Sequence, residues 1–286
     1  MAAFALVLRA SLPDGSPVPV SPHPYTELRP PWVIAHRGGM GRWPENTLFA
    51  FERALAAGAD VLEMDLQSSR DDVLMVIHDA TVDRVTDGTG AVREFTRAEL
   101  QAFDAAQHFV DASGKRSLRG NGIRIPTLEE VVAGFPDARI SVELKPEAPA
   151  LVARLCSLIR SQGADDRMMV SSFFAEVLIA FRRACPEVAT SLSVAEAAVF
   201  YARARLGFPS AEPPPAEVLI VPVSVLGFDG VAPSVLRAAG RLGLRTLVFT
   251  ANSEAQMRAL LEAGADGILT DDPVLLRSVI DSIHAP

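Results

Sequence analysis

The sequence predicts an α/β protein folded as a closed (β/α)8 barrel, the TIM-barrel architecture, on three observations. Eight short apolar runs typical of buried strands recur along the chain, and segments with helical spacing of apolar residues follow most of them. Strands that alternate with helices in this way form a parallel sheet, and 286 residues are enough to close that sheet into a barrel. The motif Ala-Gly-Ala-Asp occurs twice, at 57–60 and 263–266, each time where glycine stops a predicted helix before a strand. An open doubly wound sheet is the alternative.

The predicted elements begin after a proline-rich lead-in, residues 1–31, which we expect to be extended and not a domain of its own. The barrel then occupies residues 32–286. Its strands are expected to end near eight residues: Ala35, Leu66, Leu144, Ser171, Ser191, Val223, Phe249 and Thr270. Its helices are expected over eight ranges: 48–57, 128–132, 150–159, 176–184, 195–206, 234–242, 254–263 and 274–283.

One interval breaks this alternation. Residues 80–125 contain no clean strand–helix unit, and a loop of that length without structure of its own is uncommon in a compact domain. We interpret the interval as a small insertion after the second strand, with its own turns and one short helix over residues 97–103. Because the insertion directly follows His78 and Asp79, we expect it to roof a pocket at the end of the barrel.

Composition restricts the class of ligand. The chain is 49% hydrophobic, carries a formal net charge of −8 and has a sequence pI of about 5.2. An acidic chain is a poor match to nucleic acid or to an anionic membrane surface, both of which attract basic proteins. A phosphate ligand therefore has to be bound by positive charge at the site itself, such as a metal ion or a few cationic side chains.

The amino-terminal segment and the cysteines indicate a cytoplasmic protein without stable membrane insertion. Residues 1–10 are apolar but have no basic region, and Arg9 interrupts them, so we expect neither a secretory signal nor a membrane span. Cys156 and Cys185 lie among apolar residues, and we interpret them as small buried hydrophobic residues without a disulfide or zinc cluster. The sequence makes no prediction of the oligomeric state.

A histidine and an arginine, His36 and Arg37, follow the first predicted strand, where Gly38 and Gly39 allow a sharp turn. Arginine binds phosphate or carboxylate through two parallel hydrogen bonds, so this pair suits an anionic ligand. Taken alone, the stretch favours a buried histidine beside a turn and an arginine in a surface ion pair. The acidic residues of the next strands make a binding site for an anionic ligand the favoured interpretation.

Two carboxylates, Glu63 and Asp65, lie two residues apart in the second predicted strand and so point to the same face. In an apolar strand they need a neutralising partner, and oxygen ligands suit Mg²⁺ or Ca²⁺. The third strand adds Glu143, which completes a three-carboxylate set, and Lys145, a point charge for a phosphate. The alternatives are a surface ion-pair ladder for the first pair and an ordinary Glu–Lys pair for the second.

His78 ends another apolar run, as His36 does. Two imidazoles beside a metal-bound phosphodiester suit general acid–base catalysis, because imidazole titrates near neutral pH. His36 and His78 are therefore the candidate catalytic pair. Phe249 and Trp43 either line the pocket or pack in the core.

Together these motifs, in this order from about Trp32 to Pro273, resemble the glycerophosphodiester phosphodiesterase family. The matching motifs are His36-Arg37-Gly38, Pro44-Glu45-Asn46-Thr47, Glu63-Met64-Asp65, His78-Asp79 with Thr81-Val82-Asp83-Arg84 and Thr86, Ile125-Pro126-Thr127-Leu128-Glu129-Glu130, Glu143-Leu144-Lys145 and Gly264-Ala265-Asp266-Gly267-Ile268-Leu269-Thr270-Asp271. No single motif is decisive, but the ordered set is specific.

The resemblance implies a barrel with an insertion after the second strand and a set of functional residues. It implies that a divalent cation is held by Glu63, Asp65 and Glu143, that acid–base catalysis belongs to His36 and His78, that phosphate is held by Arg37 and Lys145, and that Glu45 orients Arg37 or His36. The implied reaction is hydrolysis of a small-molecule glycerophosphodiester to glycerol 3-phosphate and an alcohol.

Two positions depart from the family pattern. Phe249 stands where tryptophan is usual, and Trp43 stands where a small residue is common. Both departures bear on substrate selectivity at the pocket, and neither of them replaces a charged residue of the family pattern. The alternatives to the implied activity are a lysophospholipase D-type phosphodiesterase acting on a lipid, a non-catalytic barrel that binds phosphate esters, and a metal-independent carbohydrate-binding or isomerase barrel.

Overall fold

The computed structural model describes residues 22–145, 149–207, 214–225, 228–229 and 231–284. Eight parallel strands form the central barrel, in the order β6-β5-β4-β2-β1-β11-β10-β7. A bridge between Ser191 and Val218 joins the two outermost strands, so the barrel is nearly closed and the predicted fold class is confirmed. The strands are β1 (Trp32–Ala35), β2 (Val61–Ser68), β4 (Arg139–Leu144), β5 (Met168–Ser171), β6 (Ala189–Thr190), β7 (Val218–Pro222), β10 (Arg245–Phe249) and β11 (Gly267–Thr270).

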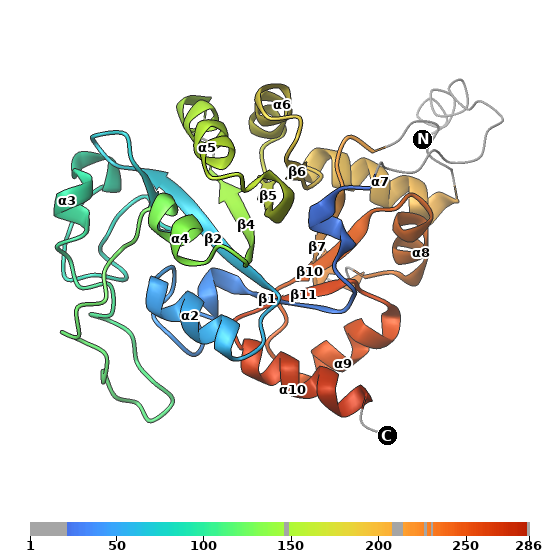
Figure 1. Ribbon diagram of the computed structural model, residues 1–286. Coiled ribbons are helices and arrows are strands. Elements are labelled where there is room, and N and C mark those ends of the chain that lie inside the picture. Colours follow the sequence, from blue (N-terminus) through green and yellow to red (C-terminus); the bar gives the residue numbers. More distant parts are fainter. Residues whose placement is uncertain (1–21, 146–148, 208–213, 226–227, 230, 285–286) are drawn as a thin grey trace.

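Helices surround the barrel on its outer face (Figure 1). Several begin where the sequence supplies a Ser or Thr cap: the side chains of Thr47, Thr127, Ser193 and Ser253 each accept a hydrogen bond from a backbone N–H of the first turn. The helices of the barrel layer are α2 (Leu48–Ala56), α4 (Leu128–Gly134), α5 (Pro149–Ser161), α6 (Ala175–Ala184), α7 (Val194–Leu206), α8 (Pro233–Arg241), α9 (Glu254–Ala263) and α10 (Pro273–His284), with a short 3₁₀ turn η4 (Asp165–Arg167) before β5.

The core has two parts. A large apolar layer lies between the strands and the helices, and a smaller cluster, which includes Ile34, Met169 and Leu247, has its members on alternate strand positions. Tyr25 belongs to the smaller cluster although it precedes the first strand. It lies in the 3₁₀ turn η1 (Pro24–Glu27), is fully buried and contacts Trp32 edge to face.

The turn η1 closes the amino-terminal end of the barrel. Arg139 and Arg245, the first residues of β4 and β10, donate to the carbonyl oxygens of Tyr25 and Thr26. The described end of the predicted lead-in is therefore part of the packed fold. The opposite end of the barrel, where the strands finish, is left for the loops that carry the polar motifs.

A short antiparallel strand, β3 (Leu74–Val76), follows β2 and pairs with its end, and the predicted insertion then contains η3 (Val92–Glu94) and α3 (Arg97–Leu100). The strand β3 and the insertion share a small core of their own, built from Met75, Val82, Val92 and Leu100 among others. A short hairpin of β8 (Ser224–Val225) and β9 (Phe228–Asp229) follows β7 and has no counterpart in the predicted elements.

A disulfide joins Cys156 on α5 to Cys185, which follows α6. The prediction of two unbonded cysteines is wrong in this respect, although both residues are buried as expected. None of the helices in the described segments is long and apolar enough to cross a membrane.

Candidate active site

Three carboxylates converge where β2 and β4 end. The two strands pair in parallel with Asp65 opposite Glu143, and Glu63 lies two residues before Asp65 on the same face. Ligand oxygens of Glu63, Asp65 and Glu143 all lie within 4.8 Å of one another, and the first two side chains are buried. The sequence-predicted acidic residues are therefore brought together by strand register.

The pKa values of the two β2 carboxylates, Glu63 and Asp65, are shifted in opposite directions. Burial, reinforced by the charge of Asp65, raises the pKa of Glu63 to about 7. Burial also acts to raise the pKa of Asp65, but the charges of Lys145 and Arg37 outweigh it and hold that pKa below its ordinary value. The site therefore concentrates negative charge that needs cationic partners.

Lys145 is one of these partners. Its Nζ lies 2.8 Å from Oδ1 of Asp65 and 2.5 Å from Oε1 of Glu143. The sequence predicts Lys145 to be a point charge for a phosphate; in the structure its ammonium group contacts two of the three carboxylates. Asp65 also accepts a hydrogen bond from the side-chain amide of Asn46, at 3.1 Å.

The turn after β1 brings Arg37 to the same carboxylates. Arg37 has a left-handed backbone (φ 51°), its backbone N–H donates to Glu63 Oε2 at 2.9 Å, and its Nε lies 3.3 Å from Asp65 Oδ2. Its Nη1 donates to Glu45 at 3.0 Å, so Glu45 contacts Arg37. Gly38 follows with φ +80°, and a Cβ there would lie 2.9 Å from Ala50 on α2, so only glycine fits this turn.

Each candidate catalytic histidine has a carboxylate on its Nδ1 atom. Nδ1 of His36 lies 2.6 Å from Asp271 Oδ1, and Nδ1 of His78 lies 2.6 Å from Asp79 Oδ1. Burial acts to lower the pKa of His36, but the hydrogen bond with Asp271 and the charge of Glu63 outweigh it, and the pKa lies above its ordinary value. The carboxylates on Nδ1 leave Nε2 of both rings for a ligand.

A cavity of about 280 Å³ contains this constellation. His36, Arg37, Glu63, His78, Glu143 and Lys145 line one part of it. Another part is apolar: Phe249 and Phe173 line it with their rings 6.3 Å apart, together with Leu192, Val194 and Ile220. Phe249 thus lies at the pocket, whereas Trp43 is packed against the core and does not line this cavity.

Several residues that hold the site together have no role predicted from the sequence. Asp271 and Asp79 contact the histidines, and Arg84 bridges Asp79 and Glu45. Gln67 donates to the carbonyl oxygen of His78. The one available signal is that Asp271, Asp79, Arg84 and Asn46 lie inside the motifs that carry the family resemblance.

The model of the glycerophosphoryl diester phosphodiesterase family matches residues 36–275. A glycerophosphodiester phosphodiesterase of Caldanaerobacter subterraneus is 31% identical over 255 residues, which cover 87% of this chain and 97% of the relative. One from Bacillus altitudinis is 33% identical over 253 residues, covering 84% and 94%. A solved structure, an Oleispira antarctica phosphodiesterase in complex with the product sn-glycerol-3-phosphate, is 27% identical with a TM-score of 0.72, covering 88% of this chain and 97% of that one.

The family model and the relatives both span most of the chain, and the matched region contains every candidate site residue. The chain therefore belongs to the glycerophosphoryl diester phosphodiesterase family.

Proposed function

We propose that the protein hydrolyses glycerophosphodiesters to glycerol 3-phosphate and an alcohol, with His36 and His78 as the acid–base pair. The observation that carries this proposal is that two carboxylates, two cationic side chains and two imidazoles line one cavity, with the buried carboxylate of Asp65 within 4.8 Å of the other two. A barrel that only binds phosphate esters has no need of two groups that exchange protons.

The three carboxylates fit a divalent cation. Their oxygens are close enough to share one ion, and two of the side chains are buried. Burial and then the charge of Asp65 raise the pKa of Glu63, and a bound cation would offset both effects. Glu63, Asp65 and Glu143 would hold it, and oxygen ligands favour Mg²⁺ or Ca²⁺. When bound, the ion supplies Lewis acidity toward a phosphate oxygen and a template for the substrate.

The chain's own residues supply the remaining chemistry. Arg37 and Lys145 offset the negative charge that grows on the phosphate oxygens in the transition state, and Glu45 holds Arg37 in place for this. One histidine takes the proton of the nucleophile, which is either water or the neighbouring glycerol hydroxyl, and the other gives a proton to the alcohol oxygen as its bond to phosphorus breaks. The net reaction consumes one water molecule and releases one alcohol.

A panel of glycerophosphodiesters, assayed through release of glycerol 3-phosphate, tests this function. We expect turnover that disappears after exhaustive chelation and returns with a divalent cation. The Glu143→Gln variant should lose this turnover, whereas Glu129→Gln, an exposed carboxylate outside the site, should keep it. Full activity of the chelated enzyme would contradict the metal site, and no turnover of any diester would contradict the function.

A lysophospholipase D-type activity is the second candidate, and the apolar part of the cavity favours it. Phe173 and Val194 line that part and are 49% and 54% exposed, so an acyl chain could extend along them without displacing a charged group. Comparison of lysophosphatidylcholine with glycerophosphocholine separates the two functions, because the substrates share a headgroup and differ in the acyl chain.

We propose the cytoplasm as the compartment, and the disulfide provides its test. The cytosol keeps most thiols reduced, so a cytoplasmic chain should carry Cys156 and Cys185 as thiols. Thiol labelling immediately after cell lysis in acid, followed by mass spectrometry, distinguishes the two forms. A stable oxidised pair in cells would instead indicate an oxidising compartment.

A further inference from the structure

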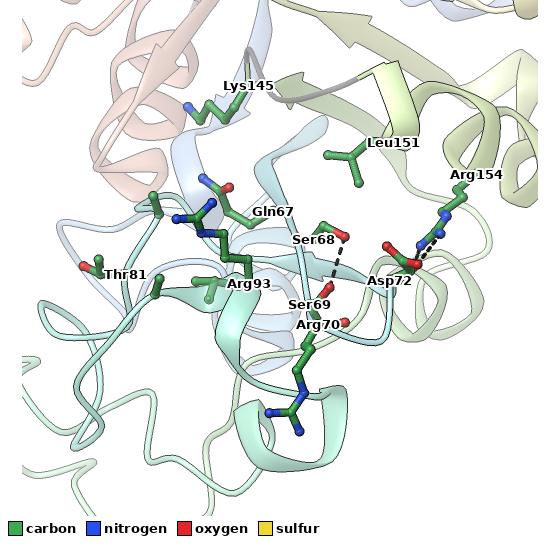
Figure 2. Close-up of a pocket in the computed structure, with 13 residues that line it drawn as sticks. Gln67, Ser68, Ser69, Arg70, Asp72, Thr81, Arg93, Lys145, Leu151 and Arg154 are labelled. Carbon is green, nitrogen blue, oxygen red and sulfur yellow. Dashed lines mark hydrogen bonds and ion pairs between the residues drawn. The ribbon is translucent and has the colours of Figure 1, made fainter.

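A second cavity, of about 440 Å³, adjoins the candidate active site. It lies between the end of β2, the turn that follows, the insertion at η3, and α5 (Figure 2). Lys145 lines both cavities, so the two recesses lie on either side of this one residue. Gln67 lines only the second cavity; it lies two residues beyond Asp65 and so on the same face of β2.

The lining of the second cavity is rich in hydrogen-bond donors with positive charge. Arg70, Arg93, Lys145 and Arg154 contribute four cationic side chains, against the single carboxylate of Asp72. Asp72 is neutralised within the cavity, since its carboxylate lies 2.7 Å from Nη2 of Arg154. Lys145 and Arg70 also have carboxylate partners, Asp65 and Glu143 for the first and Glu99 for the second, but these carboxylates do not line the cavity.

Arg93 is the donor that the fold leaves available. Arg70 donates to the carbonyl oxygen of Glu94 and pairs with Glu99, and Arg154 pairs with Asp72. Within the described residues, the guanidinium group of Arg93 has no ion-pair or hydrogen-bond partner, and it is exposed. In Figure 2 its side chain extends toward the part of the cavity where Gln67 and Lys145 lie.

This layout matches the shape of a phosphodiester, which has two alcohol arms on one phosphorus. A phosphate beside Lys145 would direct one arm to the first cavity, which Glu63, Glu143 and Phe249 line, and the other arm to the second cavity, which Gln67 and Arg93 line. A divalent cation held by Glu63, Asp65 and Glu143 would bind the glycerol arm at the first cavity, which would leave the second cavity for the alcohol that is released.

We propose that the second cavity is the headgroup subsite and that Arg93 makes it select alcohols that accept hydrogen bonds and carry no positive charge, such as glycerol, over choline. A guanidinium group donates to hydroxyl oxygens, whereas a quaternary ammonium group offers no acceptor and is repelled. Ser68 and Gln67 add neutral polar groups to the same lining. This selectivity rests on the proposed hydrolysis of glycerophosphodiesters.

The test compares glycerophosphoglycerol with glycerophosphocholine, both followed through release of glycerol 3-phosphate. The unmodified enzyme should favour glycerophosphoglycerol in kcat/KM. Arg93→Gln should reduce this preference about three- to tenfold, as expected for the loss of one exposed charged donor, and the change should lie in KM for glycerophosphoglycerol with kcat retained. Arg116→Gln, which removes an exposed arginine of the insertion that lies outside both cavities, should leave the preference unchanged.

The possible outcomes separate this inference from the function on which it rests. Turnover of both diesters with equal kcat/KM, a preference for choline, or a ratio that Arg93→Gln does not change would overturn the subsite and leave the hydrolase intact. A decrease in kcat for both substrates alike in Arg93→Gln would also overturn it, because such a change indicates a structural role. Absence of turnover with either diester would overturn the hydrolase and the subsite together.

Discussion

Nδ1 of His36 lies 2.6 Å from Oδ1 of Asp271, across the contact between the first and last strands of the barrel. His36 directly follows β1 and Asp271 directly follows β11, and the two strands pair in parallel with Ala35 opposite Thr270. The pair therefore joins residues 235 positions apart in the sequence, which the pairing of β1 with β11 brings together. The contact fixes the ring of His36 with Nε2 free for the cavity.

We expect His36→Ala and His78→Ala each to lose about 10²-fold or more in kcat, since general acid–base catalysis contributes about 10²- to 10⁴-fold. His108→Ala is the matched control, because His108 is exposed in the insertion and lines neither cavity. Circular dichroism of each variant verifies the fold. Near-normal kcat in a folded variant would remove that histidine from the mechanism.

Asp271→Asn should act through His36. We expect kcat to fall at least about tenfold, because the amide no longer selects the tautomer with the free Nε2 atom. The same change removes a contact that raises the pKa of His36, so the pH at which His36 titrates in the rate profile should move to lower values. Asp281→Asn, an exposed carboxylate on α10, serves as the control. A rate profile that loses amplitude without shifting would indicate that Asp271 does not influence His36.

Lys145→Met should make the fold depend on a divalent cation. Without Lys145, the buried carboxylate of Asp65 loses an ammonium group 2.8 Å away, and removal of one partner from such a pair costs about 3 kcal/mol. We expect urea unfolding in chelator to show this loss and added Mg²⁺ or Ca²⁺ to restore part of it. Lys115→Met, on an exposed turn of the insertion, should show neither effect. Equal loss with and without the cation would argue against a metal at the three carboxylates.

The turn that seals the amino-terminal end of the barrel gives a matched pair of variants. The hydroxyl of Tyr25 is buried and, among the described residues, has no hydrogen-bond partner, while its ring packs on Trp32. Tyr25→Phe should therefore retain stability or gain up to about 1 kcal/mol, whereas Tyr25→Ala should lose about 3 to 5 kcal/mol. Urea unfolding of the two variants measures both changes in the free energy of unfolding. A clear loss of stability in Tyr25→Phe would mean that the hydroxyl has a partner, such as a buried water molecule.

Glu196 should contribute to acid sensitivity. Burial acts to raise its pKa, but hydrogen bonds with Arg182 and Ser193 hold the pKa below the ordinary 4.5. Because the folded pKa is the lower one, this contribution to stability is present above about pH 4.5 and is lost as the pH falls through the folded value. Glu196→Gln should cost about 1 kcal/mol near pH 7 and much less near pH 3. Glu52→Gln, on an exposed part of α2, should show no such dependence.

The barrel itself was predictable because its signals are local. Apolar runs and glycine stops depend on neighbouring residues, and the predicted ends of β1, β4, β5, β10 and β11 agree with the observed ones. The spacing of Glu63 and Asp65 likewise determines which way their side chains point. The comparisons confirm the predicted family; the catalytic and metal-binding roles of these residues stay predictions.

The contacts that were not predicted join distant segments. Asp271 meets His36, and Asn46 meets Asp65, only because the barrel brings separate loops together. The disulfide follows the same rule: Cys156 and Cys185 are 29 residues apart, on neighbouring helical segments, and their apolar surroundings give no sign of the bond. The position of Lys145 between two carboxylates depends on the exact register of β2 and β4.

The buried position of Tyr25 also determines how far the chain can be shortened from its amino-terminal end without opening the barrel. The family match begins at residue 36, which invites an expression fragment that starts there. Such a fragment would lack β1 and would leave the floor of the barrel open to solvent, with Ile34 and Tyr25 missing from its inner cluster. A trimmed version that is meant to crystallise should therefore retain the chain from His23 onward, since the imidazole of this residue contacts the backbone of Glu187 and anchors the turn.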